Sequence, residues 1–450
     1  MVTVWARRFA LSRVAAACLA ITFALAAVSA APLRAAAADA SLVVTALRIV
    51  EREYYRAVDP VALLNAAVAS LRSGAQLDAA AVPDIPAGIA EEDAVRLFAA
   101  EFEHAEAEAS AREPEFAYTA TRAMLASLHD SHARFMSPDQ YAEYKDNIAG
   151  RPGYAGIGIR TTLPVKAEGP FVTAVVRDSP AAAAGIERFD QILAVNGVPL
   201  KGVSAGDIVS RLRGPAGSSV MLRIRRQGRT MDVWVTRAEI RTPPVEVQMI
   251  RPGVAYIRIW TFSRGAAVEA RGALQALGNS HDIHSIVLDL RGNPGGLVVE
   301  TEWVAGIFVP AGTVLALTHS TGLSGTLAAS GETLFPNVPL AVLVDRGSAS
   351  GAEILTIGLR DANRALVIGE TTAGAFGSGR DFPLPEGGMV ITTRALTGPR
   401  DEAVEGIGIA PDRGIPLTVD DMLHGDDSQL DVALSLLGVS RPAVLGRFAA

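Results

Sequence analysis

The chain has 450 residues, a net charge of −7, 49% hydrophobic residues and 20% charged residues. It is too apolar for a disordered protein, and its length favours two or three domains around a sizeable core. The 42 glycines follow no fixed period, which excludes collagen and simple repeats. The acidic balance and the lack of a long basic run argue against a nucleic-acid partner.

Residues 1–30 have the pattern of a cleavable signal peptide. Three arginines precede a short apolar run, and Val28-Ser29-Ala30 provides small residues before a cleavage site. We therefore expect an exported protein, periplasmic or otherwise extracytoplasmic. The run is short for a membrane span, so an uncleaved anchor, with membrane proximity, is the weaker alternative. The only cysteine, Cys18, lies in this segment, so we expect no disulfide and no cysteine-ligated zinc in the mature chain.

Hydrophobic patterning divides the remainder into four parts. Residues 31–152 begin with an Ala-rich spacer and are otherwise mainly helical, and a Gly/Pro-rich stretch ends them. Residues 153–238 contain short strands and turns. In residues 239–420 strands and helices alternate, which predicts a layered α/β core. Residues 421–450 contain a short helix and a tail.

Residues 153–238 resemble a PDZ domain. The matching features, in order, are Gly156-Ile157-Gly158-Ile159, the helix start Ser179-Pro180 with its stop at Gly185, and the strand and turn that end in Asn196-Gly197. In PDZ domains the backbone N–H groups of the glycine loop receive the C-terminal carboxylate of a peptide that adds as a strand. The resemblance therefore implies that residues 156–159 bind peptide tails.

The turn that carries Ser350 is the most informative part of the core. A strand is expected over 340–345 and a helix over 351–361, so Ser350 lies where the helix begins. Ser350-x-x-Glu353 is a capping box, which is a sufficient structural role for this serine. The functional alternative is a nucleophile beside helix N–H groups that stabilise an oxyanion, and such a serine needs a base.

Five motifs in order resemble the C-terminal processing peptidases, family S41. They are Ser131–Tyr141, Asp289–Gly296, Gly347–Ser350, Arg364–Glu370 and Gly406–Asp412. The resemblance implies a multidomain α/β protein: an N-terminal helical segment, a PDZ-like β-domain and a layered α/β core of the crotonase/ClpP-like kind. It further implies that Ser350 is the nucleophile and that proteins or peptides with accessible C-terminal tails are the substrates.

The sequence departs from the branch of this family that uses a lysine base. Ala375 stands where that lysine is expected, and Lys145, Lys166 and Lys201, the only lysines, all precede the core. Arginine stays protonated and cannot replace lysine as a base. A Ser–Lys dyad of the usual form is therefore absent.

A second, tricorn-like branch uses histidine as the base, and this chain has candidates at the matching positions. His132 would accept the proton of Ser350, Ser131 would orient the imidazole, and Glu405 would hold Ser131. His129 is a rival base.

Three further interpretations of these residues stay open. His132 is alternatively a surface or capping residue, and Ser131 a helix cap or turn residue. Glu405 is alternatively a solvated acid, for whose role Asp401 and Glu402 compete.

The oxyanion would be bound by the N–H of Gly351 and by a second donor from the loop 291–296. Gly295 and Gly296 are the two candidates for that donor, because glycine lets a substrate approach the backbone closely. The seven histidines lack HExxH-type spacing, so we expect no metal and no cofactor.

Three functions compete on this sequence. The leading hypothesis is an exported serine endopeptidase whose PDZ domain recruits C-terminal tails. The alternative, motivated by the missing lysine, is an inactive S41-like scaffold that binds through its PDZ domain. A crotonase-like acyl-CoA enzyme is a third, less favoured interpretation. The sequence leaves the oligomeric state open.

Overall fold

The computed structural model describes residues 40–108, 115–151, 153–320 and 323–439, and the expected signal peptide lies outside them. The first described part is helical: α1 (Ala40–Glu53), α2 (Pro60–Ala75), α3 (Glu91–Glu108) and α4 (Glu115–Ala126). Asp59 caps α2 by accepting hydrogen bonds from the N–H groups of Val61 and Ala62, and Pro60 occupies the first turn, as the sequence chemistry favours. Among the described residues, no helix is long and apolar enough to cross a membrane.

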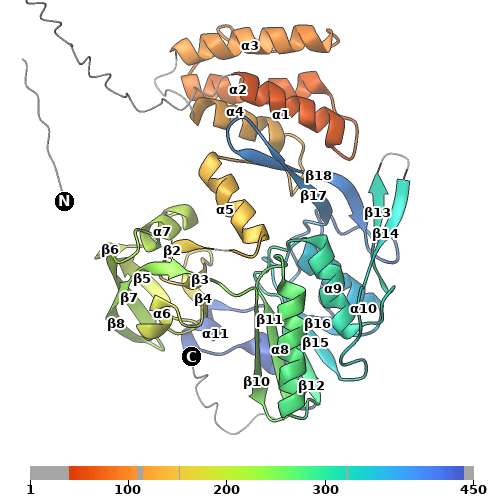
Figure 1. Ribbon diagram of the computed structural model, residues 1–450. Coiled ribbons are helices and arrows are strands. Elements are labelled where there is room, and N and C mark those ends of the chain that lie inside the picture. The colour runs from red at the N-terminus through yellow and green to blue at the C-terminus, as the bar shows by residue number, and fades with distance from the viewer. Residues whose placement is uncertain (1–39, 109–114, 152, 321–322, 440–450) are drawn as a thin grey trace, which may run out of the picture. The chain divides into compact units, whose positions relative to one another are not determined.

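One short strand joins this helical part to the core. Strand β1 (Arg134–Met136) pairs antiparallel with β18 (Gly388–Thr397), with Phe135 opposite Met389. Phe382, Met389 and Ile391 of the β17–β18 hairpin are buried in the same apolar cluster as the N-terminal helices. Figure 1 shows the helices lying over this hairpin. The segment just before β1, which holds Ser131 and His132, is thereby held against the core.

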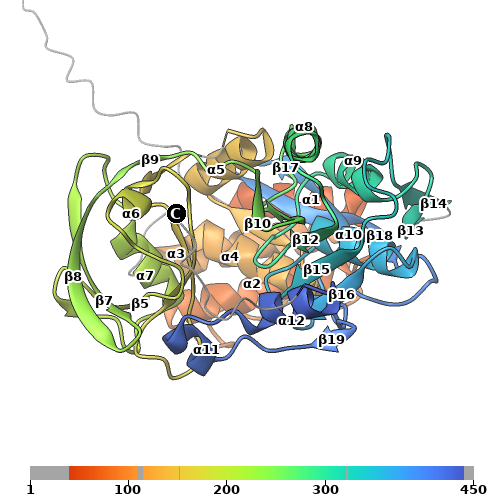
Figure 2. The same cartoon turned by 90° about the horizontal axis from the view of Figure 1, so that it is seen from below.

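The PDZ-like region follows α5 (Pro138–Ile148) and consists of short strands with two helices (Figures 1 and 2). Its main sheet has the order β3-β4-β5-β7-β8, and β2 pairs with β9. The bounds are β2 (Tyr154–Gly156), β3 (Ile159–Thr162), β4 (Phe171–Val175), α6 (Pro180–Ala183), β5 (Gln191–Val195), β6 (Val198–Pro199), α7 (Ala205–Leu212), β7 (Ser219–Arg226), β8 (Arg229–Thr236) and β9 (Ala238–Ile240). Ser179 caps α6 as expected, because its side chain accepts a hydrogen bond from Ala182 N.

The core is built on a six-stranded sheet in the order β10-β11-β12-β15-β16-β19. In this sheet β11, β12, β15, β16 and β19 run parallel, and β10 pairs antiparallel with β11 at one edge. The bounds are β10 (Val245–Arg251), β11 (Val254–Ile259), β12 (Ser285–Asp289), β15 (Leu340–Val344), β16 (Leu366–Gly369) and β19 (Arg413–Gly414). Every residue of β11, β12 and β15 is buried, as in parallel sheets covered on both faces.

Helices cover this sheet, and a second sheet lies beyond them. The helices are α8 (Ala266–Ser280), α9 (Val298–Phe308) and α10 (Gly351–Asp361) on one face, and α12 (Ser428–Leu436) on the other. The second sheet contains β13 (Val314–Ser320), β14 (Leu323–Ala328), β17 (Gly377–Pro383), β18 and β1. The short helix α11 (Val419–His424) precedes α12. The layered α/β core expected from the sequence is confirmed, whereas β1 and the β13–β14 hairpin were not predicted.

The order of the strands places two functional loops together. Strands β12 and β15 are parallel neighbours, so the loop after Asp289 and the turn after Val344 leave the same edge of the sheet. Loops at the carboxyl ends of adjacent parallel strands commonly form binding sites. The glycine-rich loop 291–296 and Ser350 therefore lie side by side.

Candidate functional site

Ser350 has a strained backbone at the start of α10. Its φ of 53° and ψ of −115° lie outside the regions that non-glycine residues favour. Such a conformation costs about 1–3 kcal/mol and persists only where the surrounding structure enforces it. A strained serine between a strand and a helix is the geometry that exposes a nucleophile in other hydrolases.

The buried carboxylate of Glu353 enforces this turn. Its Oε2 accepts the N–H groups of Ser350 and Ala375, each at 3.0 Å. Its Oε1 accepts the Thr372 hydroxyl at 2.5 Å and the Gly374 N–H at 2.8 Å. Burial raises the pKa of Glu353, while these four donated hydrogen bonds oppose the shift. The Ser350-to-Glu353 half of the expected capping box is therefore present, and the same carboxylate also fixes the segment 372–375.

The segment 372–377, where the family's lysine base is expected, contains no lysine and contacts the serine through its backbone. Ala375 holds the nucleophile turn through its backbone, because its carbonyl accepts the Ser350 N–H at 3.1 Å. Lys145 lies elsewhere, with its Nζ 3.1 Å from Asp381 Oδ2 on β17. The other two lysines, Lys166 and Lys201, belong to the PDZ-like region.

Ser131, His132 and Glu405 form a hydrogen-bonded chain. Ser131 Oγ donates to Glu405 Oε1 at 2.7 Å, and His132 Nδ1 lies 3.2 Å from the same Oγ. The hydroxyl has a single hydrogen, which the carboxylate takes, so Oγ accepts from Nδ1–H. The neutral imidazole then carries its proton on Nδ1, and Nε2 presents a lone pair. Glu405 is itself anchored by the Phe376 N–H, 2.5 Å from Oε2.

The His132 imidazole is buried, and its Nε2 has no hydrogen-bond partner among the described residues. Burial lowers the pKa of His132, against the opposing influence of the Asp130 and Glu405 carboxylates. The imidazole is consequently neutral at pH 7 and able to accept a proton. The rival His129 is exposed.

No hydrogen bond joins His132 Nε2 to Ser350, but one short segment contacts both residues. Ala375 O accepts the Ser350 N–H, and a Cβ added to Gly377 would lie 3.2 Å from His132 Nδ1. Two residues of extended chain span about 7 Å. The serine and the imidazole therefore contact the same segment, residues 375–377, from which a hydrogen bond between them can form when substrate binds.

The two candidate glycines of the loop 291–296 differ in their N–H groups. A Cβ on Gly295 would lie 2.7 Å from Ser350 Cβ, so this glycine allows the loop to reach the serine. Its N–H, however, already donates to Asn293 Oδ1 at 2.8 Å. The N–H of Gly296 has no acceptor within the described chain. The loop is also tied to the turn, because Asn293 O accepts the Ala349 N–H at 2.9 Å.

The glycine loop of the PDZ-like region is held by the start of α6. Gly158 has a φ of +83°, and a Cβ there would lie 2.3 Å from Ser179 Cβ. Ile157 O accepts the Ala181 N–H at 2.8 Å. Residues 156–159 line a cavity of about 770 Å³, which Gly292 and Gly347 of the core also line. The expected peptide-binding loop thus opens onto a space that reaches the core.

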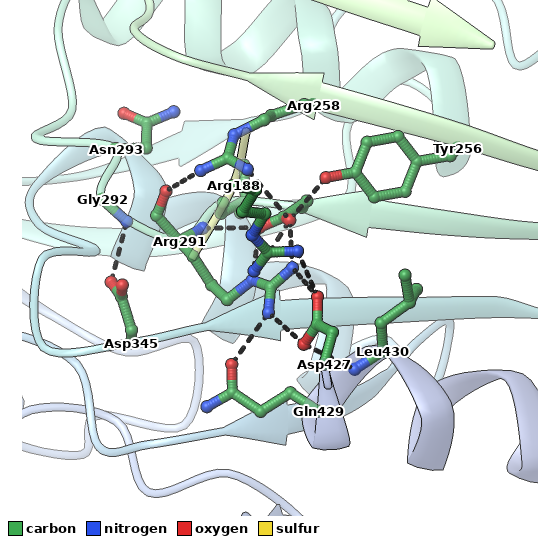
Figure 3. Close-up of polar contacts among 12 residues, drawn as sticks. Arg188, Tyr256, Arg258, Arg291, Gly292, Asn293, Asp345, Asp427, Gln429 and Leu430 are labelled. Carbon is green, nitrogen blue, oxygen red and sulfur yellow. Dashed lines mark hydrogen bonds and ion pairs between the residues drawn. The ribbon is translucent and has the colours of Figure 1, made fainter. Parts of the chain in front are cut away.

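A cluster of buried ion pairs behind the loop 291–296 was not predicted from the sequence. Arg291 is bound by Asp289 and by Asp427, and Arg188 of the PDZ-like region also binds Asp427 (Figure 3). The only sequence signal was an acid at the end of a buried strand with an arginine two residues later.

No group of three His, Cys, Asp or Glu side chains in the described part could hold a metal ion. The site described above offers a hydroxyl, an imidazole, carboxylates and backbone N–H groups.

Comparison with known proteins assigns the two main parts of the chain. Residues 253–415 match peptidase family S41, and residues 171–226 match the PDZ domain. A carboxyl-terminal-processing protease of Synechocystis sp. is 32% identical over 72% of this chain and 78% of its own length. A protein of the same name from Picosynechococcus sp. is 33% identical over 67% of this chain and 73% of that protein.

A solved structure gives the same assignment. The photosystem II D1 C-terminal processing protease superposes with a TM-score of 0.52 at 25% identity, over 86% of this chain and 96% of that one. An S41 protease structure from Bacteroides fragilis, at 16% identity and a TM-score of 0.56, shares the fold. The chain belongs to peptidase family S41 and is a serine-type peptidase with a PDZ domain.

Proposed function

We propose that this peptidase is an exported endopeptidase that recruits proteins by their C-terminal tails and cleaves them with Ser350 as nucleophile and His132 as base. The observation that carries the proposal is the free Nε2 of a buried, neutral imidazole whose Nδ1–H is held by Ser131 and Glu405. The strained backbone of Ser350, whose N–H donates to Ala375 O, also supports the proposal.

In the first step Ser350 Oγ attacks the scissile carbonyl carbon while its proton moves to His132 Nε2. The imidazolium that forms is stabilised because Ser131 Oγ accepts its Nδ1–H while the Ser131 hydroxyl donates to the Glu405 carboxylate. The N–H of Gly351 and, of the two candidates, that of Gly296 donate to the oxyanion, because the Gly295 N–H is already engaged.

Collapse of the tetrahedral intermediate breaks the C–N bond, and the leaving amine takes the proton from His132. Water then attacks the acyl-enzyme with His132 again as base, which releases the acid and restores Ser350. A tail bound by residues 156–159 enters the cavity that the PDZ-like region shares with the core. The names of the relatives, which are carboxyl-terminal-processing proteases, support this substrate class. Export rests on residues 1–30, as the sequence pattern predicts.

A fluorophosphonate probe tests the nucleophile directly. We expect the wild-type protein to be labelled and to hydrolyse tail-bearing peptides, and Ser350→Ala to lose both activities while still binding a tail peptide. Ser348→Ala serves as the matched control, because Ser348 lies in the same turn but donates to Leu290 O instead. Labelling that survives in Ser350→Ala would refute the assignment.

A further inference from the structure

The C-terminal segment 417–437 contacts the PDZ-like region and the core at the same time. Met422 of α11 packs with Phe171 and Phe189 of the PDZ-like region. Leu430 and Leu434 of α12 pack on the outer face of the core sheet. Between the two helices lies Asp427, whose side chain is only 9% exposed. The segment therefore bridges the two regions, with a buried carboxylate at its centre.

Asp427 binds one arginine from each side (Figure 3). Arg188 Nη1 of the PDZ-like region lies 2.5 Å from Oδ2, and Arg291 Nη1 lies 2.8 Å from Oδ1. Arg291 also donates to Asp289 and, through Nη1, to Gln429 Oε1 at 3.0 Å. The two arginines hold the pKa of Asp427 far below its ordinary value. The carboxylate is thus ionised, and both guanidinium groups depend on it.

Arg291 is the first residue of the loop that reaches the nucleophile turn. Its carbonyl accepts Arg258 Nη2 at 3.2 Å, and Gly292 N donates to Asp345 Oδ1 at 2.8 Å (Figure 3). A second PDZ arginine, Arg160, donates to Gly292 O at 3.3 Å. Further along the loop, Asn293 accepts the Ala349 N–H next to Ser350. A displacement at Arg291 would therefore be transmitted to the oxyanion donors.

We infer that Asp427 is a positioning residue that couples the placement of the PDZ-like region to the loop 291–296 through Arg188 and Arg291. This inference rests on the proposed function, in which that loop supplies an oxyanion donor. Removal of the Asp427 charge leaves the partly exposed Arg188 and the buried Arg258 and Arg291 with Asp289 as the one remaining acid of the cluster. A buried charge that loses its partner is strongly unfavourable. The arginines then separate, and the PDZ-like region is no longer held in a fixed position relative to the loop 291–296.

Asp427→Asn tests the coupling with little change in shape. Asparagine is as good a helix N-cap as aspartate, so the cap on Leu430 N is kept. We expect kcat for a tail peptide to fall roughly 10-fold to 100-fold, because small displacements of reacting groups have effects of that size, while KM stays unchanged. Asp426→Asn, the same change of charge at an exposed neighbour, should leave both constants unchanged. Arg188→Gln should reproduce the loss of kcat, and the double variant should be no worse than either single one.

A second measurement does not require activity. In a Cys18→Ser background, spin labels on cysteines at Thr230 of β8 and Val268 of α8, both exposed, report the distance between the PDZ-like region and the core. We expect a narrow distribution that broadens in Asp427→Asn and in Arg188→Gln, and not in Asp426→Asn.

Two results would overturn the inference. One is a wild-type distance distribution and kcat in Asp427→Asn. The other is additive effects of Asp427→Asn and Arg188→Gln on kcat, which would mean that the two residues act separately. If the wild-type protein hydrolyses no tail peptide, the proposed function fails, and the distance measurement alone decides whether Asp427 couples the two regions.

Discussion

Ser350 and His132 are held in place by contacts of very different range. The Ser350 turn depends on Glu353 and Ala375, which lie 3 and 25 residues further along the chain. His132 depends on Ser131, whose partner Glu405 is 274 residues away. It also depends on Asp130, whose carboxylate accepts the Thr392 hydroxyl of β18 at 2.9 Å, 262 residues away.

The core by itself therefore fixes the turn that carries the nucleophile, whereas the base reaches the site only if the N-terminal part packs against the core. Strand β1 and the apolar contacts of the helices with β17–β18 bring the base to the core. A change that loosens this attachment should therefore remove the base and leave the serine turn intact. Substitutions in the nucleophile half (Ser350 and Glu353) and in the base half (His132, Ser131 and Glu405) therefore test the two parts of the site separately.

The largest effect is expected for His132→Gln. Without a proton acceptor, Ser350 is a weak nucleophile, and kcat should fall roughly 10⁴-fold or more, as in other serine hydrolases that lose the histidine. Steady-state hydrolysis of a tail peptide measures this loss. His129→Gln is the control and should keep full activity. Unaltered hydrolysis by His132→Gln would exclude the imidazole as the base.

Glu353→Gln should damage the nucleophile half. The carboxylate now accepts hydrogen bonds from four donors, two on each oxygen. In the variant the amide nitrogen would face two of those donors and could accept from neither, so we expect a loss of about 3 kcal/mol in unfolding free energy. Urea denaturation measures this value, and fluorophosphonate labelling should slow as the Ser350 turn relaxes. The exposed Glu332→Gln should change neither property. Wild-type stability in Glu353→Gln would show that the four hydrogen bonds are not what fixes the turn.

Ser131→Ala and Glu405→Gln should have intermediate effects on the base half. Each removes a group that orients the imidazole without removing the imidazole, and we expect kcat to fall about 10-fold to 100-fold. If the two residues act as one chain, the double variant should be no slower than the slower single variant. Asp401→Asn, a nearby exposed acid, is the control. Equal activity of Glu405→Gln and wild type would assign Glu405 a purely surface role.

The smallest expected effect is a shift in pH dependence. Because burial lowers the pKa of His132, the acid limb of kcat/KM should have its midpoint below the ordinary histidine value of 6.5. Activity should be constant above that pH and fall as the imidazole protonates. The same shift makes the folded state lose stability as the pH falls through 6.5 towards the lowered pKa, because the unfolded chain then binds a proton that the folded chain does not. A limb above pH 6.5 would contradict a buried neutral base.

The sequence alone determined the features that depend on neighbours along the chain. The Ser179 cap, the Ser350–Glu353 pair and the alternation of strands and helices in the core all follow from short-range hydrogen bonding and periodicity, and each is present. The lack of a lysine near Ser350 is likewise a fact of the sequence. Short strands such as β1 escaped prediction, because three residues carry too little periodicity to be distinguished from a helix end.

Only the tertiary structure decided which distant groups meet. The resemblance to the tricorn-like branch named Glu405 as the partner of Ser131, but the hydrogen bond between them, which sets the tautomer of His132, forms only in the fold. This bond and the contacts of Asp427 with two arginines join segments more than a hundred residues apart. Such contacts arise from strand pairing and from the packing of whole elements, and no local pattern encodes them. The engagement of Gly295, which leaves Gly296 as the freer donor, also depends on one side chain, Asn293, whose direction the folded loop sets.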